Sequence, residues 1–158
     1  MATKVLMVCL GNICRSPMAE GLLRHKIQEL NLDVETDSAG TSGIHIGSKP
    51  DHRMIDTAAK YGVDISDLRA RQFKASDLET FDYVFAMDKE NQRNMLALAK
   101  NETQRNKVKL FLEQVNYPEL SEVPDPYYGD QAAFEFVFNL LDEATDTFIN
   151  QITTNIKI

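Results

Sequence analysis

A cysteine and an arginine near the N-terminus have the types and the spacing to bind and attack a phosphate. Residues 9–15 read Cys-Leu-Gly-Asn-Ile-Cys-Arg. Gly11 and Asn12 most easily adopt left-handed backbone angles, so we expect this segment to curl and turn successive N–H groups inward around an anion. Arg15 can bind two phosphate oxygens at once. The same positive field favours Cys9 as the thiolate, an in-line nucleophile, and the alternative is a buried, inert cysteine.

An aspartate held between two prolines is the candidate proton donor. Asp125 lies between Pro124 and Pro126, which stiffen the chain and preset the position of the carboxyl. A leaving group that departs from phosphorus as an anion benefits from a proton donor, and such a step commonly contributes about 10²–10⁴-fold. The alternative is an ordinary turn aspartate. Tyr127 and Tyr128 follow, and we expect them to wall a cleft for an aromatic ring, with packing in the core as the alternative.

The elements around these residues are expected to place them at one edge of a sheet. Residues 5–8 form a continuous apolar run, which indicates a strand buried on both faces. Ser16 is a suitable N-cap, and Pro17 a suitable first residue, for a helix whose apolar spacing continues to Leu30. Further strands are expected at 33–38, 83–87 and 108–112, and further helices at 51–61 with Gly62 at its end, from 88 toward 99, and from Asp130 to the C-terminus.

The alternation of strands and helices predicts an α/β fold. We expect a single-domain three-layer sandwich over residues 1–158, in which a four-stranded parallel sheet carries helices on both faces. Ligands of such sheets bind beyond the carboxyl ends of the strands. The phosphate-binding loop at residues 9–15 follows the first strand and would lie at that edge.

Composition excludes several classes of partner. The net charge is −7, and the basic residues are scattered, which argues against nucleic acid or an anionic membrane as a partner. Two cysteines make no disulfide framework, and neither a signal peptide nor a membrane-spanning stretch is evident, so we expect a cytoplasmic location. His25, His45 and His52 form no ligand cluster and are expected to be solvated. No metal and no cofactor is predicted.

Residues 9–20 closely resemble the active-site signature of the low-molecular-weight protein tyrosine phosphatases. The resemblance extends over nearly the whole chain and includes the acidic segment around Asp125. It implies the same four-stranded parallel fold. The other segments that carry it are 38–41, Pro50 with Asp51, Arg53, 70–72, 81–83, 87–88 and 125–129.

The resemblance also implies a mechanism. Cys9 would form a phosphocysteine, and Arg15 would stabilise the transition state. Asp125 would protonate the leaving phenolate and then deprotonate the hydrolytic water. Asn12 and Ser16 would support the loop and the thiolate. The substrate-binding residues would be Leu10, Gly11, Asn12, Ile13, Cys14, Ser16, Ile44, Tyr127 and Tyr128.

Three positions depart from, or discriminate within, that family. Ile44 occupies a site where many members carry an aromatic residue, so it offers less surface to a substrate ring. Leu68 stands where several members have a histidine that supports the loop. Ile13 is typical of the tyrosine enzymes, whereas the arginine phosphatases have threonine there. We therefore expect phosphotyrosine proteins or small aryl phosphates as substrates.

Other functions remain to be weighed against this one. They are a phosphoarginine phosphatase, an arsenate reductase of the same fold, a non-catalytic phosphotyrosine-binding module and a redox protein. No cysteine follows Cys14, which disfavours the thioredoxin-coupled arsenate reductases. Cys14 is expected to form a reversible disulfide with Cys9 under peroxide, or else to be a small packed thiol. We expect a monomer or weak dimer.

Overall fold

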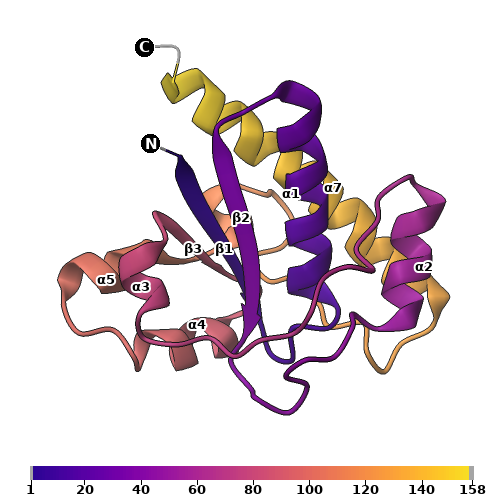
Figure 1. Cartoon of the computed structure of the whole chain (residues 1–158), viewed down its shortest axis with the longest axis horizontal. Coiled ribbons are helices and arrows are strands. Elements are labelled where there is room, and N and C mark those ends of the chain that lie inside the picture. Colours follow the sequence, from indigo (N-terminus) through magenta and orange to yellow (C-terminus); the bar gives the residue numbers. More distant parts are fainter. Residues whose placement is uncertain (1, 157–158) are drawn as a thin grey trace.

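The computed structural model describes residues 2–156, which contain a parallel four-stranded sheet (Figure 1). All three pairs of neighbouring strands are parallel, with Cys9 opposite Gly40 at the carboxyl ends of the first two strands. The prediction of a four-stranded parallel sheet is confirmed. The strands are β1 (Thr3–Cys9), β2 (Val34–Gly40), β3 (Tyr83–Ala86) and β4 (Val108–Leu110), in the order β2-β1-β3-β4.

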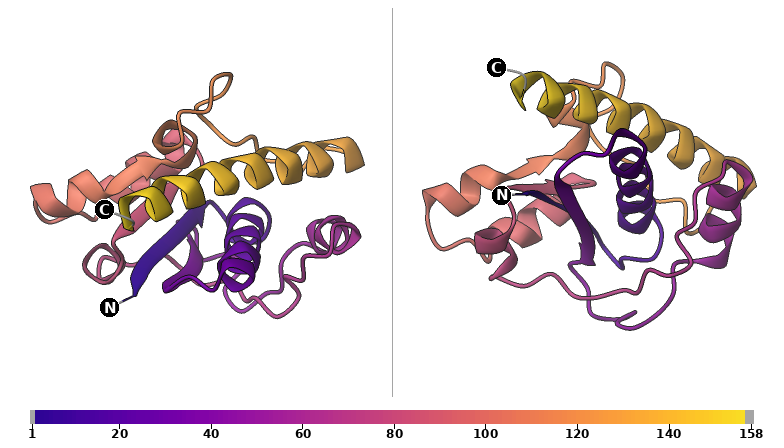
Figure 2. Two further views of the ribbon diagram at one scale, coloured as in Figure 1. Left: turned by 90° about the horizontal axis from the view of Figure 1, so that it is seen from above. Right: turned by 45° about the horizontal axis from the view of Figure 1, so that its top comes forward.

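Helices cover both faces of the sheet, so the predicted three-layer arrangement is also confirmed (Figure 2). On one side, α1 packs against β1, β2 and α7, while α2 and α6 pack against α7; on the other, α4 packs on β3 and β4. No helix within residues 2–156 is long and apolar enough to cross a membrane. The helices are α1 (Arg15–Leu30), α2 (His52–Lys60), α3 (Asp77–Thr80), α4 (Lys89–Leu96), α5 (Glu102–Lys107), α6 (Phe111–Gln114) and α7 (Gln131–Ile156).

The central strand β1 is buried on both faces, as its apolar run predicts. Val5, Met7 and Cys9 belong to the core cluster under α1 and α7. Leu6 and Val8 belong to the core cluster on the opposite face. Because successive strand side chains point to opposite faces, Cys9 ends β1 on the side where α1 begins.

Two predicted helix starts are confirmed and one is wrong. Asp88 caps α4 by accepting the Asn91 N–H at 2.7 Å, and Asp130 accepts the Ala133 N–H at 3.1 Å at the start of α7. Helix α1, however, begins at Arg15 with Cys14 as its N-cap, and not after Ser16. The reason is that the Ser16 hydroxyl is engaged inside the phosphate-binding loop.

The predicted strand at 108–112 is too long. Strand β4 ends at Leu110, and α6 follows at once. Phe111 and Leu112 belong to α6 and are buried in the core cluster that α1 and α7 also enter. Their apolar character therefore reflects the burial of a helix and not of a strand. A short apolar run does not distinguish a buried strand from a buried helical turn. Helices α3 and α5 have no counterpart among the predicted elements.

Candidate active site

Residues 9–15, hereafter the phosphate loop, form the floor of a cavity of about 220 Å³ beyond the carboxyl end of β1. The loop joins β1 to α1, so its backbone lies at the N-terminus of a sixteen-residue helix. Asn12 and Ser16, also predicted to bind substrate, are not among the lining residues, because both side chains are buried and bond to each other. The lining residues are Cys9, Leu10, Gly11, Ile13, Cys14, Arg15, Ile44, His45, Asp125, Tyr127 and Tyr128.

The curl of the loop depends on Asn12. Its φ is 59°, in the left-handed region, as predicted, and its side chain is buried. The amide Nδ2 donates to Ser16 Oγ at 2.8 Å and to Ser38 Oγ at 2.9 Å, while Oδ1 accepts the Arg71 N–H at 3.0 Å. These bonds use the amide's donors and its acceptor, so the turn is fixed in one orientation.

Two glycines give the loop room, for reasons the sequence does not indicate. The φ of Gly11 is not positive, contrary to prediction. A Cβ there would instead lie 3.0 Å from Cδ2 of His45, whose ring packs against the loop. At the end of β2, a Cβ on Gly40 would lie 2.7 Å from the Leu10 carbonyl oxygen and 3.0 Å from the Asn12 nitrogen. The loop can pass over β2 because Gly40 carries no side chain.

Cys9 is the buried sulfur at the base of the cavity. Its Sγ lies 3.0 Å from Ser16 Oγ, which already accepts a hydrogen bond from Asn12. The single Ser16 hydroxyl proton can point at the sulfur or at the Ala39 carbonyl oxygen, which lies farther away at 3.4 Å. Such a bond stabilises a thiolate more than a thiol, because charge strengthens it.

Cys14 differs from Cys9 in its surroundings. It is buried, and burial raises the pKa of its thiol, with Asp51, Cys9 and Asp125 adding to the effect. Cys14 therefore remains protonated at neutral pH. Both cysteines are free thiols in this structure. Of the two cysteines that line the cavity, Cys9 is the one whose sulfur lies within hydrogen-bond distance of the Ser16 hydroxyl.

Arg15 is held by acidic groups from two other segments. Nη1 donates to Asp88 Oδ2 at 2.7 Å and to the Val123 carbonyl oxygen at 3.1 Å, and Nη2 lies 3.6 Å from Asp125 Oδ2. Burial disfavours its charge, but Cys9, Asp88 and Asp125 outweigh burial and raise the pKa of Arg15. The guanidinium is a permanent cation fixed in place. The sequence does not single out Asp88 as a site residue, because it is far from the loop in the chain.

Asp125 stands at the mouth of the cavity, opposite the phosphate loop. Its side chain is 42% exposed, and Oδ1 accepts the Tyr127 N–H at 3.1 Å. Tyr127 and Tyr128 stack edge to face with ring centroids 4.9 Å apart. Both rings are exposed, so the alternative of core packing is excluded. Ile44, 83% exposed, forms another part of the rim.

A buried carboxyl lies behind Asn12. Glu20 on α1 accepts the Ser38 hydroxyl at 2.6 Å, and Ser38 accepts from Asn12. Burial raises the pKa of Glu20 to about 7. Leu68 is partly buried against the apolar core and brings no polar group to the loop. In this chain the polar support of the loop therefore comes from Ser38, Glu20 and the Arg71 backbone.

The histidines divide between surface and cavity. His52 is 86% exposed, and His25 is 43% exposed beside Glu29. His45 is half-buried and lines the cavity, so the expectation that it is solvated is wrong. Within residues 2–156 no three or more His, Cys, Asp or Glu side chains gather as metal ligands.

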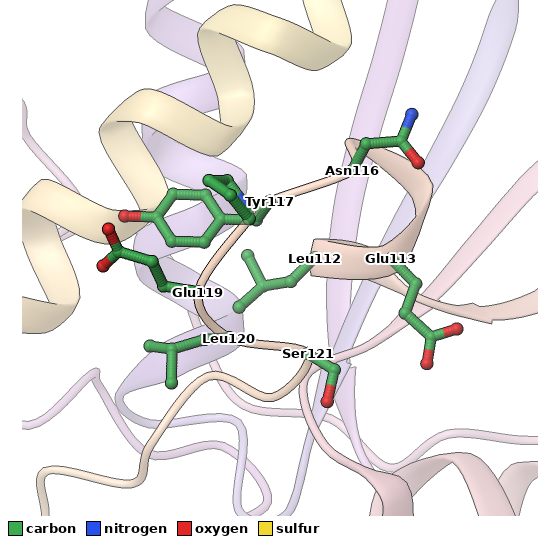
Figure 3. Close-up of a pocket in the computed structure, with 8 residues that line it drawn as sticks. Leu112, Glu113, Asn116, Tyr117, Glu119, Leu120 and Ser121 are labelled. Carbon is green, nitrogen blue, oxygen red and sulfur yellow. The ribbon is translucent and has the colours of Figure 1, made fainter.

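A larger cavity of about 510 Å³ lies elsewhere, around the turn after α6 (Figure 3). It is an open groove whose lining carries two glutamates and none of the cysteine, histidine or arginine side chains that line the smaller cavity. The smaller cavity is the one with the chemistry. The groove is lined by Leu112, Glu113, Asn116, Tyr117, Pro118, Glu119, Leu120 and Ser121.

Fold and cavity together define a class of protein: a three-layer α/β protein with a cysteine–arginine phosphate loop after its first strand. Residues 4–157 match the family model described as low molecular weight phosphotyrosine protein phosphatase. The protein of that name from Schizosaccharomyces pombe is 40% identical over 152 residues, 94% of this chain and 96% of that one. The Homo sapiens protein is 41% identical over 141 residues, 87% and 88% of the two chains.

A solved structure agrees with the sequence relatives. The crystal structure of a protein tyrosine phosphatase from Entamoeba histolytica superposes with a TM-score of 0.91 at 36% identity, covering 98% of this chain and 99% of that chain. The chain belongs to the low molecular weight phosphotyrosine protein phosphatase family.

Proposed function

We propose that this phosphatase hydrolyses phosphotyrosine and other aryl phosphate monoesters through a phosphocysteine on Cys9. One observation carries the proposal: the Cys9 thiol, the Arg15 guanidinium and the Asp125 carboxyl line a single cavity of about 220 Å³. A nucleophile, a cation for the phosphate oxygens and a proton donor are the three groups that this reaction needs.

In the first step, the Cys9 thiolate attacks phosphorus, the bond from phosphorus to the aryl oxygen breaks, and Asp125 gives its proton to the leaving phenolate. Arg15 and the loop amides bind the phosphate oxygens, while Ser16 holds the sulfur by its hydrogen bond.

In the second step, water attacks the phosphorus of the phosphocysteine. The Asp125 carboxylate takes a proton from that water, the phosphorus–sulfur bond breaks, and the Cys9 thiolate is restored together with inorganic phosphate. Asp125 thus ends the cycle protonated, as it began. All the groups used belong to the chain, so the proposal involves no cofactor.

The rim of the cavity supports phosphotyrosine as the substrate group. Tyr127 and Tyr128 offer aromatic surface, and Ile13 keeps the floor apolar, in favour of phosphotyrosine over phosphoarginine. Ile44 offers less stacking surface than an aromatic residue would. We infer that phosphotyrosine proteins and small aryl phosphates are both substrates.

Composition and the site also support proposals on the location, the partners and the oxidation of the protein. The free thiols favour a cytoplasmic location, and the net charge of −7 disfavours nucleic acid and anionic membranes as partners. We propose one domain over residues 1–158, a monomer or weak dimer, and reversible oxidation of Cys9 by disulfide formation with Cys14, which lines the same cavity.

The test is hydrolysis of p-nitrophenyl phosphate and of a phosphotyrosine peptide by the parent, Cys9→Ser and Asp125→Asn proteins. We expect turnover by the parent, none by Cys9→Ser, and a drop of about 10²-fold or more in Asp125→Asn. Tight phosphopeptide binding without turnover by the parent would favour the binding module instead. Phosphoarginine as the better substrate would favour the arginine phosphatase.

A further inference from the structure

We propose that Arg53 is a positioning residue for the acid loop, residues 121–130, which it ties to the phosphate loop through Asp51. The inference rests on the function proposed above, because it concerns the placement of Asp125 against Cys9. The chain of contacts runs from the phosphate loop to the carboxyl that would donate the proton.

The first link joins the phosphate loop to the start of α2. The Asp51 N–H donates to the Ile13 carbonyl oxygen at 2.7 Å. The Asp51 side chain is 8% exposed and caps α2 by accepting the Arg53 N–H at 2.9 Å. Asp51 is therefore fixed to the loop by its backbone and to the helix by its carboxylate.

The second link is a two-pronged ion pair. Arg53 Nε donates to Asp51 Oδ1 at 3.0 Å, and Nη2 donates to Oδ2 at 2.8 Å. These hydrogen bonds lower the pKa of Asp51 against the opposing effect of burial. The pair stays ionised over the neutral range, and its planar geometry fixes the guanidinium.

The third link reaches the acid loop. Arg53 Nη2 donates to the Tyr127 carbonyl oxygen at 3.0 Å. Its guanidinium carbon lies 5.5 Å from the Tyr127 ring centroid and 4.6 Å from that of Phe134, at the start of α7. The Tyr127 N–H donates to Asp125 Oδ1, while Arg15 lies near Oδ2, so the residue held by Arg53 helps to orient the carboxyl.

The acid loop needs such an anchor because it has no regular structure. No helix or strand lies between Gln114 and Gln131. Near the start of the loop, the Val123 N–H donates to the Met87 carbonyl oxygen at 2.8 Å. The Gly129 N–H donates within the loop, to the Pro126 carbonyl oxygen. Of the hydrogen bonds found among residues 2–156, the one that reaches the backbone of 124–129 from another element comes from Arg53.

Arginine is required by this geometry. Its planar fork serves the Asp51 carboxylate with two nitrogens, donates to the Tyr127 carbonyl and stacks on two rings. A lysine at this position keeps the charge but loses the fork and the stacking. Arg53→Lys is therefore an informative variant as well as Arg53→Ala.

The experiment compares phenyl phosphate with p-nitrophenyl phosphate by kcat/KM. Phenolate needs a proton when it leaves, whereas p-nitrophenolate needs one much less. We expect Arg53→Ala to lower the ratio of kcat/KM for phenyl phosphate to that for p-nitrophenyl phosphate by about tenfold, which is part of the 10²–10⁴-fold that general acid catalysis contributes in full. Arg53→Lys should lower this ratio less than Arg53→Ala does. Asp125→Asn, which removes the proton donor itself, should give the lowest ratio of the three variants.

Two controls separate positioning from general damage. Lys60 is another cation of α2, which pairs with Glu135 of α7, and Lys60→Ala should leave the ratio unchanged. In the double variant Arg53→Ala with Asp125→Asn, the ratio should equal that of Asp125→Asn alone, because Arg53 acts through Asp125. If Arg53 were needed only for the fold, Arg53→Ala would lower kcat/KM for both esters equally, in the parent and in Asp125→Asn alike.

The proposal is overturned if the ratio is unchanged in Arg53→Ala, or if it falls further in the double variant than in Asp125→Asn alone. Should Arg53→Ala not fold, as judged by its thermal transition, the same comparisons are made with Arg53→Lys. Failure of the proposed function would look different: the parent would hydrolyse neither ester, or Cys9→Ser would retain turnover.

Discussion

Replacing Glu20 by glutamine should stabilise the folded protein at neutral and higher pH. Glu20 is 6% exposed, and burial raises its pKa to about 7 from 4.5. Asp37 and Asp67 add to the increase, while the Ser38 hydroxyl and Arg24 oppose it. The folded protein therefore binds this proton more tightly than the unfolded chain does.

The direction and size of the effect follow from linkage. Between pH 4.5 and about 7 the unfolded chain loses the proton first, so the contribution of Glu20 to stability falls as pH rises and levels off above about 7. At about 1.4 kcal/mol for each pH unit, the loss amounts to about 3 kcal/mol. Glutamine does not titrate and its oxygen can still accept the Ser38 hydroxyl, so Glu20→Gln should gain about 1–3 kcal/mol at pH 8.

Urea unfolding of parent and Glu20→Gln at pH 5, 6, 7 and 8 measures this difference. The gap between the two free energies of unfolding should widen from pH 5 to pH 7 and then stay constant. Glu29→Gln, on the same helix with a side chain that is 64% exposed, is the matched control and should show no such widening. A gap for Glu20→Gln that does not change with pH would refute the reasoning.

Three further predictions concern the cavity. Ser16→Ala removes the hydroxyl that lies 3.0 Å from Cys9 Sγ. Because a hydrogen bond to a charged group contributes about 1.5–3 kcal/mol, this variant should lower kcat for p-nitrophenyl phosphate about tenfold or more. An unchanged kcat would contradict this role of Ser16. Ile44→Trp adds stacking surface at an exposed rim position and should lower KM for aryl phosphates about two- to tenfold; an unaltered KM would remove Ile44 from the substrate site. Cys14→Ser, treated with peroxide and then with a thiol reductant, should recover less activity than the parent. In this variant a Cys9 sulfenic acid has no neighbouring thiol in the cavity with which to form a protective disulfide. Equal recovery would exclude the disulfide.

The sequence predicts those parts of the site that depend on local spacing. Cys9 and Arg15 are separated by one loop, and Asp125 is marked by its flanking prolines, so residue type and spacing identify them without a structure. The same holds for β1, whose continuous apolar run reflects burial on both faces. Each of these features is recorded in a few consecutive residues.

Other parts of the site depend on contacts between distant segments. Asp88 holds Arg15 across 73 positions, and Gly40 makes room for the loop from the end of another strand. His45 looks like an ordinary loop histidine until its ring is found against Gly11. Neither periodicity nor local spacing predicts such pairs, because they form only when the parallel strands bring their carboxyl ends together.

The central claim is that phosphate passes through the Cys9 sulfur. The direct measurement is to quench the reaction of the Cys14→Ser protein with p-nitrophenyl phosphate in acid during turnover and to sequence the N-terminal peptide by mass spectrometry. One phosphoryl group on Cys9, absent after substitution of Cys9 by serine, is the predicted result. Steady turnover with no phosphoryl group on Cys9, or with one on another residue, would contradict the account.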